Sequence, residues 1–299
     1  MPSLTQPDNR AAGAAWRIRG RTIALDRPII LGIVNVTPDS FSDGGSFLAL
    51  EAAVAHAGRL VEEGADILDV GGESTRPQGA VAVTAEEERR RVVPVVRELR
   101  RRFPEVPISV DTVKAETASA ALGEGATIVN DVSGFRLDPA LAGVCAEHGA
   151  GVILMHSRGG VSEMGTYTHA SYGDDVVGEV VGELREAVAR ARAGGLPDEA
   201  IVLDPGVGFA KRSAHSLAVL AELPRLVALG FPVLVGASRK RFIGELTKAS
   251  EPARRVYGTV GANVVALARG ARLFRVHDIR PSREALDVAW AVLAAEGGQ

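Results

Sequence analysis

Eight short runs of apolar residues recur along the chain, and each is followed by a polar loop and a segment with helical spacing. The runs span 29–36, 67–72, 107–112, 127–134, 151–156, 201–206, 232–238 and 273–278. They are nearly continuous in apolar residues and do not alternate, which is typical of parallel strands covered by helices. The intervening segments place apolar residues at helical intervals, and several end in glycine. The pattern therefore predicts a regular alternation of strands and helices.

Eight strand–helix units in roughly 270 residues match a (β/α)8 TIM barrel, which typically takes about 250 residues. A doubly wound open sheet is the alternative that strand counting leaves open. Before the first run, residues 14–28 read as two short strands with a turn at Arg19 and Gly20, which predicts a short N-terminal β-hairpin closing the barrel bottom. The expected organisation is a disordered tail over residues 1–15 and one barrel domain over 16–299.

Polar side chains occur where each predicted strand ends, and that is where a (β/α)8 barrel carries its functional residues. The set is Asn35, Glu73, Ser74, Thr75, Arg76, Asp111, Asn130, Asp131, His156, Asp204, Ser238, Arg239, Lys240, Arg275, His277 and Asp278. A single Asp or Asn at such a position is often only the cap of the next helix. However, Asp111, Asn130 and Asp204 follow apolar runs, where burial without a polar partner is costly. A polar ligand in the barrel mouth would supply that partner.

These side chains fall into two chemical groups. Two carboxylates, an amide and an ammonium group suit a planar heterocycle that has both N–H donors and ring acceptors, such as a pterin. They are Asp111, Asn130, Asp204 and Lys240, with Arg275 able to stack on the ring and with Met155 and Phe209 as apolar contacts. The second group suits the oxygens of phosphate or diphosphate. It comprises Asn35, Thr75, Arg76, Arg275 and His277.

Composition narrows the classes of function. A net charge of −3 and a sequence pI near 6.1 give no general attraction for nucleic acid or an anionic membrane. No stretch approaches the roughly 18 consecutive apolar residues of a membrane span, and residues 1–15 lack the apolar core of a secretory signal. The one cysteine, Cys145, cannot form an internal disulfide. We therefore expect a cytoplasmic protein that binds small molecules, with no nucleic-acid and no membrane partner.

A set of linked motifs carries a family resemblance. The stretches NVTPDSFSDGG, DVGGESTRP, SVDT, IVNDVSG, LMH, LDPGVGF, SRK and RVHD occur in this order between about residues 28 and 292. In order and spacing they resemble the dihydropteroate synthase family, the pterin-binding barrel enzymes of folate biosynthesis. The resemblance implies condensation of (7,8-dihydropterin-6-yl)methyl diphosphate with 4-aminobenzoate, in an SN1-like reaction that uses Mg2+ and releases diphosphate.

The resemblance also assigns roles to residues. It implies that Asp111, Asn130, Met155, Asp204, Phe209, Lys240 and Arg275 hold the pterin, and that Asn35, Thr75, Arg76, Arg275 and His277 contact the diphosphate. Asn35 would bind the metal. The implied aminobenzoate pocket comprises Pro38, Phe41, Thr75, Ser238 and Arg241, and the implied catalytic group comprises Asp111, Asp204, Lys240 and Asp43 near the metal. The loops 37–45 and 74–79 would close over the substrates, with hinge freedom from Gly44 and Gly45.

The sequence departs from the family pattern at four places: the inserted Gln78, Val207, the segment SRGGVSEMG after His156, and Arg241 in place of a small hydroxyl residue. We expect Gln78 to alter sulfonamide affinity more than turnover, which unchanged inhibition constants after its deletion would disprove. Two alternatives stay open: a pterin-dependent methyltransferase and a catalytically silent paralogue that binds pterin. The resemblance also implies a homodimer formed through the late helices.

Overall fold

The structure, a computed structural model, describes residues 15–36, 45–74 and 83–296. Within these ranges the chain has eight parallel strands: β3 (Ile29–Asn35), β4 (Ile67–Gly71), β5 (Ile108–Asp111), β6 (Ile128–Asp131), β7 (Gly151–Met155), β8 (Ile201–Asp204), β9 (Leu234–Val235) and β10 (Leu273–Val276). They pair in the order β8-β7-β6-β5-β4-β3-β10-β9. A bridge between Leu203 and Val233 joins the two ends of that order. The predicted (β/α)8 barrel is therefore confirmed over the open sheet.

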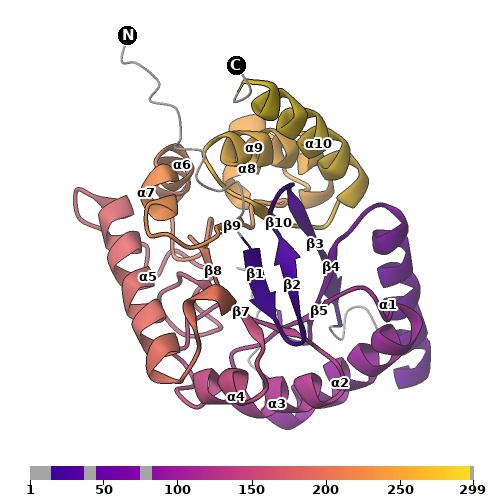
Figure 1. Ribbon diagram of the computed structural model, residues 1–299. Helices are drawn as coiled ribbons and strands as arrows, with labels where there is room; N and C mark the ends of the chain where they lie inside the picture. Colours follow the sequence, from indigo (N-terminus) through magenta and orange to yellow (C-terminus); the bar gives the residue numbers. More distant parts are fainter. Residues whose placement is uncertain (1–14, 37–44, 75–82, 297–299) are drawn as a thin grey trace.

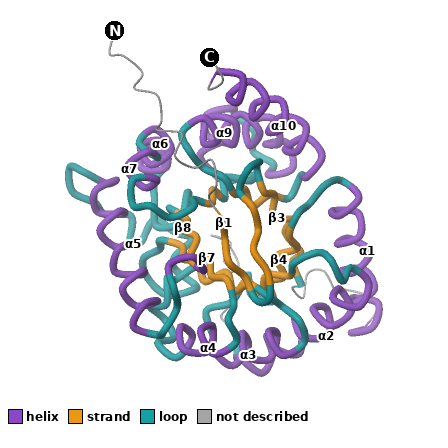
Figure 2. The backbone as a smooth tube through the Cα atoms, in the orientation of Figure 1, coloured by secondary structure: helices purple, strands orange, loops and turns teal. Residues whose placement is uncertain are grey.

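Helices surround the barrel on every side (Figures 1 and 2). They are α1 (Gly45–Glu62), α2 (Ala85–Arg102), α3 (Ala115–Gly123), α4 (Leu141–Glu147), α5 (Val176–Ala193), α6 (Ser213–Ala221), α7 (Pro224–Val227), α8 (Arg241–Thr247), α9 (Val256–Ala268) and α10 (Ile279–Glu296). α2 shows why the sequence begins a helix where it does. The Thr84 hydroxyl accepts the Glu87 N–H at 3.2 Å, and Glu87 also pairs with Arg90 and Arg91 on the next turn. None of the described helices is long and apolar enough to cross a membrane.

The N-terminal hairpin covers one end of the barrel. It consists of β1 (Ala15–Ile18) and β2 (Arg21–Ala24), paired antiparallel, and Figure 1 shows it lying across the near end of the strands. Trp16 is fully buried there, and its indole N–H donates to the carbonyl oxygen of Ala200 at 2.8 Å. The predicted hairpin is confirmed, and its first strand begins at Ala15, the last residue of the range expected to be a tail.

A layer of apolar side chains closes the barrel beneath the hairpin. Trp16, Ile18 and Leu25 pack against residues from seven of the eight strands: Ile29, Leu31, Ile67, Ile128, Ile153, Val202, Leu234 and Leu273. Because strand residues alternate between faces, positions two residues further along each strand face the interior again. There the chemistry changes, since these positions are Ile33, Asp69, Asn130, Met155, Asp204, Gly236 and Arg275. The barrel is thus apolar at its N-terminal end and mostly polar at its C-terminal end.

One strand differs from its prediction. The apolar run 232–238 predicted a strand of ordinary length, but β9 contains only Leu234 and Val235. From Gly236 the chain leaves the ladder and turns, with the Lys240 N–H bonded to the Ala237 carbonyl and with a left-handed φ of +57° at Arg239. The run is apolar because Ala237 stays buried and Val235 packs in the core, so hydrophobicity alone could not show where pairing stops.

Candidate active site

A cavity of about 1080 Å3 opens at the C-terminal ends of the strands. Most residues predicted for the site line it: Asn35, Asp111, Asn130, Met155, Asp204, Phe209, Ser238, Lys240, Arg241, Arg275 and His277. Five others lie outside the described residues, namely Pro38, Phe41, Asp43, Thr75 and Arg76. The structure therefore brings together, in one cavity, the described members of both the ring-recognising group and the phosphate-recognising group.

Arg275 is held between two carboxylates at the base of this cavity. Its Nε donates to Asp69 Oδ2 at 2.5 Å and its Nη2 donates to Asp111 Oδ2 at 2.7 Å. The amide of Asn130 donates to the same Asp69 oxygen at 3.2 Å. These contacts fix the plane of the guanidinium group, because two of its nitrogens, Nε and Nη2, each donate to a carboxylate. Arg275 thus has a defined orientation before any ligand enters.

Burial and the neighbouring charges shift the pKa values of these groups. Burial raises the pKa of Asp111 above its ordinary value, Arg275 opposes that shift, and the charge of Asp69 adds to it. Burial alone would lower the pKa of Arg275, but Asp69 and Asp111 raise it above its ordinary range. The guanidinium group consequently stays charged, and it balances two carboxylates that would otherwise repel each other.

Asp204 and Lys240 line the same cavity. Asp204 Oδ1 accepts the Gly206 N–H at 2.7 Å, and burial raises the pKa of this carboxyl group to about 6. The Lys240 ammonium lies 3.7 Å from the centre of the Phe209 ring, in cation–π geometry. Burial, and next the charge of Arg275, lower the pKa of Lys240 to about 7. A ring entering here would meet an acceptor, a donor and an aromatic face.

Apolar side chains form one wall beside these polar groups. Met155 and Phe209 belong to a small buried cluster with Val113, Val132 and Met164, separate from the main core. A flat heterocycle buries its faces against such a surface while its edges bond to the polar groups. The cavity thus offers both kinds of contact that a pterin ring requires.

Ser238 and His277 are bonded to each other at the phosphate-recognising end. The Ser238 hydroxyl accepts the backbone N–H of His277 at 3.1 Å and lies 2.9 Å from His277 Nδ1. When the hydroxyl donates to Nδ1, the neutral imidazole carries its proton on Nε2. Asn35 lines the same cavity from the end of β3. Ser238 therefore orients His277, in addition to the role expected from the sequence.

Arg241 lies at the outer rim as the first residue of α8. Its guanidinium group stacks over the Tyr167 ring at 4.4 Å, and Arg212 lies 5.2 Å from the same ring on a neighbouring element. Tyr167 and Arg241 both line the cavity. Arg241 therefore brings a positive charge to the cavity lining, which suits an incoming carboxylate.

Several strand-end residues serve the structure. Glu73 accepts the Val83 N–H and pairs with Lys114 at 2.9 Å. Arg239 pairs with Asp278 through two hydrogen bonds, at 2.9 and 2.6 Å. Asp131 makes local contacts, because it accepts the backbone N–H groups of Ser133 and Phe135 at 2.7 and 2.6 Å. The side chains at these positions therefore form ion pairs or turn contacts within the protein, as expected if a strand-end polar residue serves the local structure.

Two residues important to the cavity were not predicted from the sequence. Asp69 lies inside β4 instead of at its end, and Lys211 lines the cavity although only 1% of its surface is exposed. The available signal was an ionisable residue inside an apolar segment. Asp69 interrupts the run ILDVGG, and Lys211 closes the glycine-rich stretch GVGFAK. Strand-end counting passes over both positions.

The fold and cavity have a counterpart among known families. Residues 31–277 match the family described as pterin binding enzyme. The chain therefore belongs to the family of pterin-binding enzymes.

Relatives within that family are named more specifically. A dihydropteroate synthase of Synechocystis sp. is 45% identical over 270 residues, which is 89% of this chain and 90% of the relative. The dihydropteroate synthase of Escherichia coli (strain K12) is 43% identical over 278 residues, 93% of this chain and 96% of the relative. These relatives assign the chain to the dihydropteroate synthases, a group of transferases.

Solved structures agree with this assignment. Xanthomonas albilineans dihydropteroate synthase with 4-aminobenzoic acid has a TM-score of 0.87 at 48% identity, covering 95% of this chain and 99% of that one. The same enzyme in complex with 7,8-dihydropteroate gives 0.82 at 47% identity, covering 93% and 99%. Yersinia pestis dihydropteroate synthase in a sulfonamide drug complex gives 0.85 at 40% identity, covering 94% and 99%.

Proposed function

We propose that the chain condenses (7,8-dihydropterin-6-yl)methyl diphosphate with 4-aminobenzoate in folate biosynthesis, giving 7,8-dihydropteroate and diphosphate. The observation that carries this proposal is the single cavity in which Asp111, Asn130, Asp204 and Lys240 face the same space as His277. The Xanthomonas albilineans relative supports it, because structures of that enzyme contain 4-aminobenzoic acid and 7,8-dihydropteroate.

Pterin recognition follows from the donors and acceptors of the cavity. Asp204 and Asn130 present acceptors and a donor to the ring edge, and the Lys240 ammonium donates to a ring nitrogen or carbonyl. The ring lies against Met155 and Phe209, both almost fully buried. Arg275 stacks on the exposed face in the orientation that Asp69 and Asp111 impose.

Departure of the diphosphate requires that its growing negative charge be neutralised. Among the described residues, Arg275 and His277 carry donors at this end of the cavity. Mg2+ fits here as well, because Asn35 offers an amide oxygen and Mg2+ commonly completes its shell with substrate phosphate oxygens and water. No group of three or more His, Cys, Asp or Glu side chains in the described part of the chain could hold a metal alone. When bound, the ion would supply further charge neutralisation to the leaving group.

The pterin methylene gains positive charge as its C–O bond to diphosphate breaks. The carboxylates of Asp111 and Asp204, close to the ring in a buried cavity, stabilise that charge. The aniline nitrogen of 4-aminobenzoate then forms the C–N bond and loses a proton, while Arg241 and Ser238 receive the carboxylate end. No activated nucleophile of the protein takes part in this SN1-like sequence.

The role of Asp111 gives a direct test. Asp111→Asn keeps the shape of the side chain but removes the negative charge next to the methylene, so we expect a loss of turnover of about 100-fold or more. The measurement is kcat for dihydropteroate formation, with circular dichroism to show that the variant is folded. Turnover near the wild-type rate in the folded variant would refute the role of this carboxylate.

We also propose a homodimer formed through the late helices. An apolar groove of about 420 Å3 runs between α6, α8 and α9, and it includes the exposed side chains of Leu217, Leu246 and Val265. Contiguous exposed apolar surface of this kind marks protein–protein contacts. Val265→Glu should shift sedimentation from dimer to monomer, and a wild-type chain that sediments as a monomer would disprove the proposal.

A cytoplasmic location remains a prediction, supported by the single, buried and unpaired Cys145.

A further inference from the structure

The turn after β8 begins next to Asp204, carries Phe209, and has a strained backbone. We call residues 205–212 the β8–α6 turn. Its φ angles are +65° at Gly206, +79° at Gly208 and +45° at Ala210. A Cβ at Gly206 would lie 1.9 Å from the carbonyl oxygen of His156, so only glycine fits. Ala210 does carry a Cβ, and the left-handed region is unfavourable for it. Other interactions must therefore hold the turn in this shape.

Lys211, which lines the cavity, supplies such interactions. Its Nζ donates to the carbonyl oxygens of Gly206 and Phe209, both at 3.2 Å, and lies 2.7 Å from His156 Nδ1. An ammonium group has three hydrogens, and this arrangement presents three acceptors. The charged form of Lys211 thus ties the two halves of the β8–α6 turn to the end of β7. A neutral amine has only two hydrogens and would leave one acceptor unpaired.

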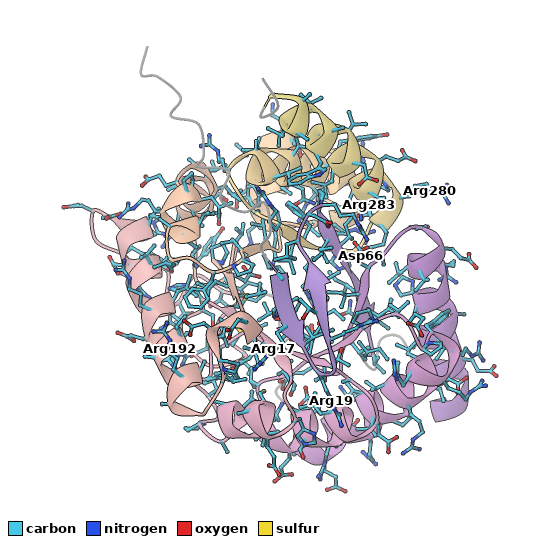
Figure 3. The ribbon with its side chains drawn as sticks, in the orientation of Figure 1. Arg17, Arg19, Asp66, Arg192, Arg280 and Arg283 are labelled. Carbon is cyan, nitrogen blue, oxygen red and sulfur yellow. The ribbon has the colours of Figure 1, made fainter. Side chains whose placement is uncertain are left out.

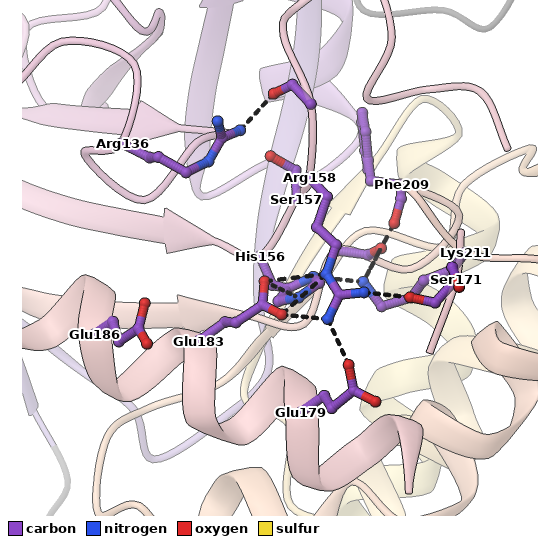
Figure 4. A network of polar contacts seen from close by, with 12 residues as sticks. Arg136, His156, Ser157, Arg158, Ser171, Glu179, Glu183, Glu186, Phe209 and Lys211 are labelled. Atoms are coloured by element: carbon purple, nitrogen blue, oxygen red, sulfur yellow. Dashed lines mark hydrogen bonds and ion pairs between the residues drawn. The ribbon is translucent and has the colours of Figure 1, made fainter. Parts of the chain in front are cut away.

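The contact with Lys211 continues outward as a chain of polar groups (Figure 4). Because His156 Nδ1 accepts from Lys211, the neutral imidazole carries its proton on Nε2, which lies 3.1 Å from Glu183 Oε2. Glu183 pairs with Arg158, which also pairs with Glu179 at 2.7 Å. Burial lowers the pKa of His156 to about 4, so the ring stays neutral and able to accept. The tautomer of His156 is therefore set by its contact with Lys211.

Several charged groups from neighbouring elements shift the pKa of Lys211. Burial lowers the pKa of Lys211 to about 7, while Asp204 and Glu183 oppose that shift and Arg158 and Lys240 add to it. The other facing groups are the ring of His156 and that of His215 in α6. Lys211 in turn acts to lower the pKa of Asp204. The ammonium form is present below about pH 7 and is lost as the pH rises through that value.

We propose that Lys211 is a positioning residue of the synthase site, whose ammonium group holds the β8–α6 turn in the shape that presents Phe209 and Asp204 to the pterin. The inference rests on the proposed function, because it takes those two residues as ring contacts. Loss of the ammonium group should weaken pterin binding. It should leave aminobenzoate binding unchanged, because Ser238 and Arg241 belong to the turn after β9 and to α8.

The first test compares removal of the buried cation Lys211 with removal of a partly buried cation, Arg283. Lys211→Met should raise KM for the pterin diphosphate about tenfold, leave KM for 4-aminobenzoate unchanged, and weaken 7,8-dihydropteroate binding in calorimetry to a similar extent. Lys211→Arg retains the charge and donors and should recover part of that loss. The matched control is Arg283→Met at the opposite end of the barrel, where Arg283 bonds to Asp66 and to the Pro28 carbonyl (Figure 3). It should lower stability without changing either KM.

A folded Lys211→Met variant with wild-type pterin KM and wild-type dihydropteroate affinity would overturn the inference. The proposed function would stand in that case, because it is judged on turnover by the wild-type chain. If the wild-type chain showed no turnover, the function would fail, and dihydropteroate binding by the Lys211 variants would still decide the inference.

The second test needs no substitution in the core. It therefore tests the positioning role of Lys211 even if Lys211→Met does not fold. The chain has only four lysines, Lys114, Lys211, Lys240 and Lys248, so 15N-lysine labelling yields four Nζ signals in NMR. Lys248 is exposed and serves as the reference. If the pterin binds preferentially to the ammonium form, saturation with 7,8-dihydropteroate must raise the pKa of Lys211. A pKa of Lys211 that does not change on binding would overturn the inference.

Discussion

Asp69 accepts the Nε hydrogen of Arg275 from beneath the cavity, and it also receives the Asn130 amide. Asp69→Asn would replace a charged acceptor with a neutral one of the same shape and release the guanidinium plane. Charge-assisted hydrogen bonds contribute about 1.5–3 kcal/mol, so we expect kcat/KM for the pterin substrate to fall about tenfold or more. Steady-state kinetics with the pterin concentration varied would measure this.

A similar carboxylate–arginine pair at the other end of the barrel gives the control. Asp66 pairs with Arg283 at 3.0 Å and with Arg27 at 2.5 Å, on the face that Figure 3 turns toward the viewer. Asp66→Asn should cost stability but leave kcat/KM unchanged, because no part of this pair reaches the cavity. Equal kinetic losses in both variants would show that Asp69 acts through general stability and does not position Arg275.

The titration of Asp204 and Lys240 predicts the pH dependence of ligand binding. Asp204 has a pKa raised to about 6, so its ionised form is lost as the pH falls through that value. Lys240 has a pKa lowered to about 7, so its ammonium form is lost as the pH rises. Affinity for 7,8-dihydropteroate, measured by calorimetry, should therefore peak between about pH 6 and 7 and decline on both sides. A constant affinity from about pH 5 to about pH 9 would contradict these assignments.

Whether the sequence predicted a site residue depended on where that residue lies along its strand. Asn35, Asp111, Asn130 and Asp204 end apolar runs, so the barrel rule was enough to place them near one another. Asp69 was missed because it lies within its strand, where only the three-dimensional pairing with Arg275 reveals its partner. The local contacts of Asp131 were equally invisible, since an Asp that serves a turn and an Asp that binds a ligand leave the same mark in sequence.

Among the secondary-structure elements, the N-terminal hairpin has the clearest energetic role. It covers the apolar end of the barrel with Trp16, which is fully buried. Trp16→Ala should lower the free energy of unfolding by about 3–5 kcal/mol, because it leaves a large cavity and the Ala200 carbonyl unpaired. Urea unfolding would measure the loss, and the pterin KM should not change because the substitution is at the opposite end from the site. A change below about 1 kcal/mol would show that the hairpin is not part of the core.

The elements themselves were largely predictable, and β9 shows where prediction stopped. Continuous apolar runs identify buried parallel strands, and the intervening helical patterns identify the helices that pack against them. The extent of hydrogen bonding depends instead on the turn at residues 237–240, where the chain leaves the ladder after Val235. The loop segments 37–44 and 75–82 lie outside the described residues, so the predicted lid over the substrates stays a prediction.

For the whole molecule, the decisive feature is that the described residues proposed to recognise the ring and those proposed to recognise diphosphate line one cavity at one end of a closed barrel. A pterin-dependent methyltransferase would need only the first of these, and a silent paralogue would use neither for turnover. Family membership and 40–48% identity to dihydropteroate synthases favour the synthase over both.

The most direct measurement is diphosphate release from (7,8-dihydropterin-6-yl)methyl diphosphate, by purified protein with Mg2+, in the presence and absence of 4-aminobenzoate. We predict sustained release only when both substrates are present, with one dihydropteroate formed for each diphosphate. Release that is absent under both conditions, or that proceeds without dihydropteroate formation, would contradict the synthase assignment of this cavity.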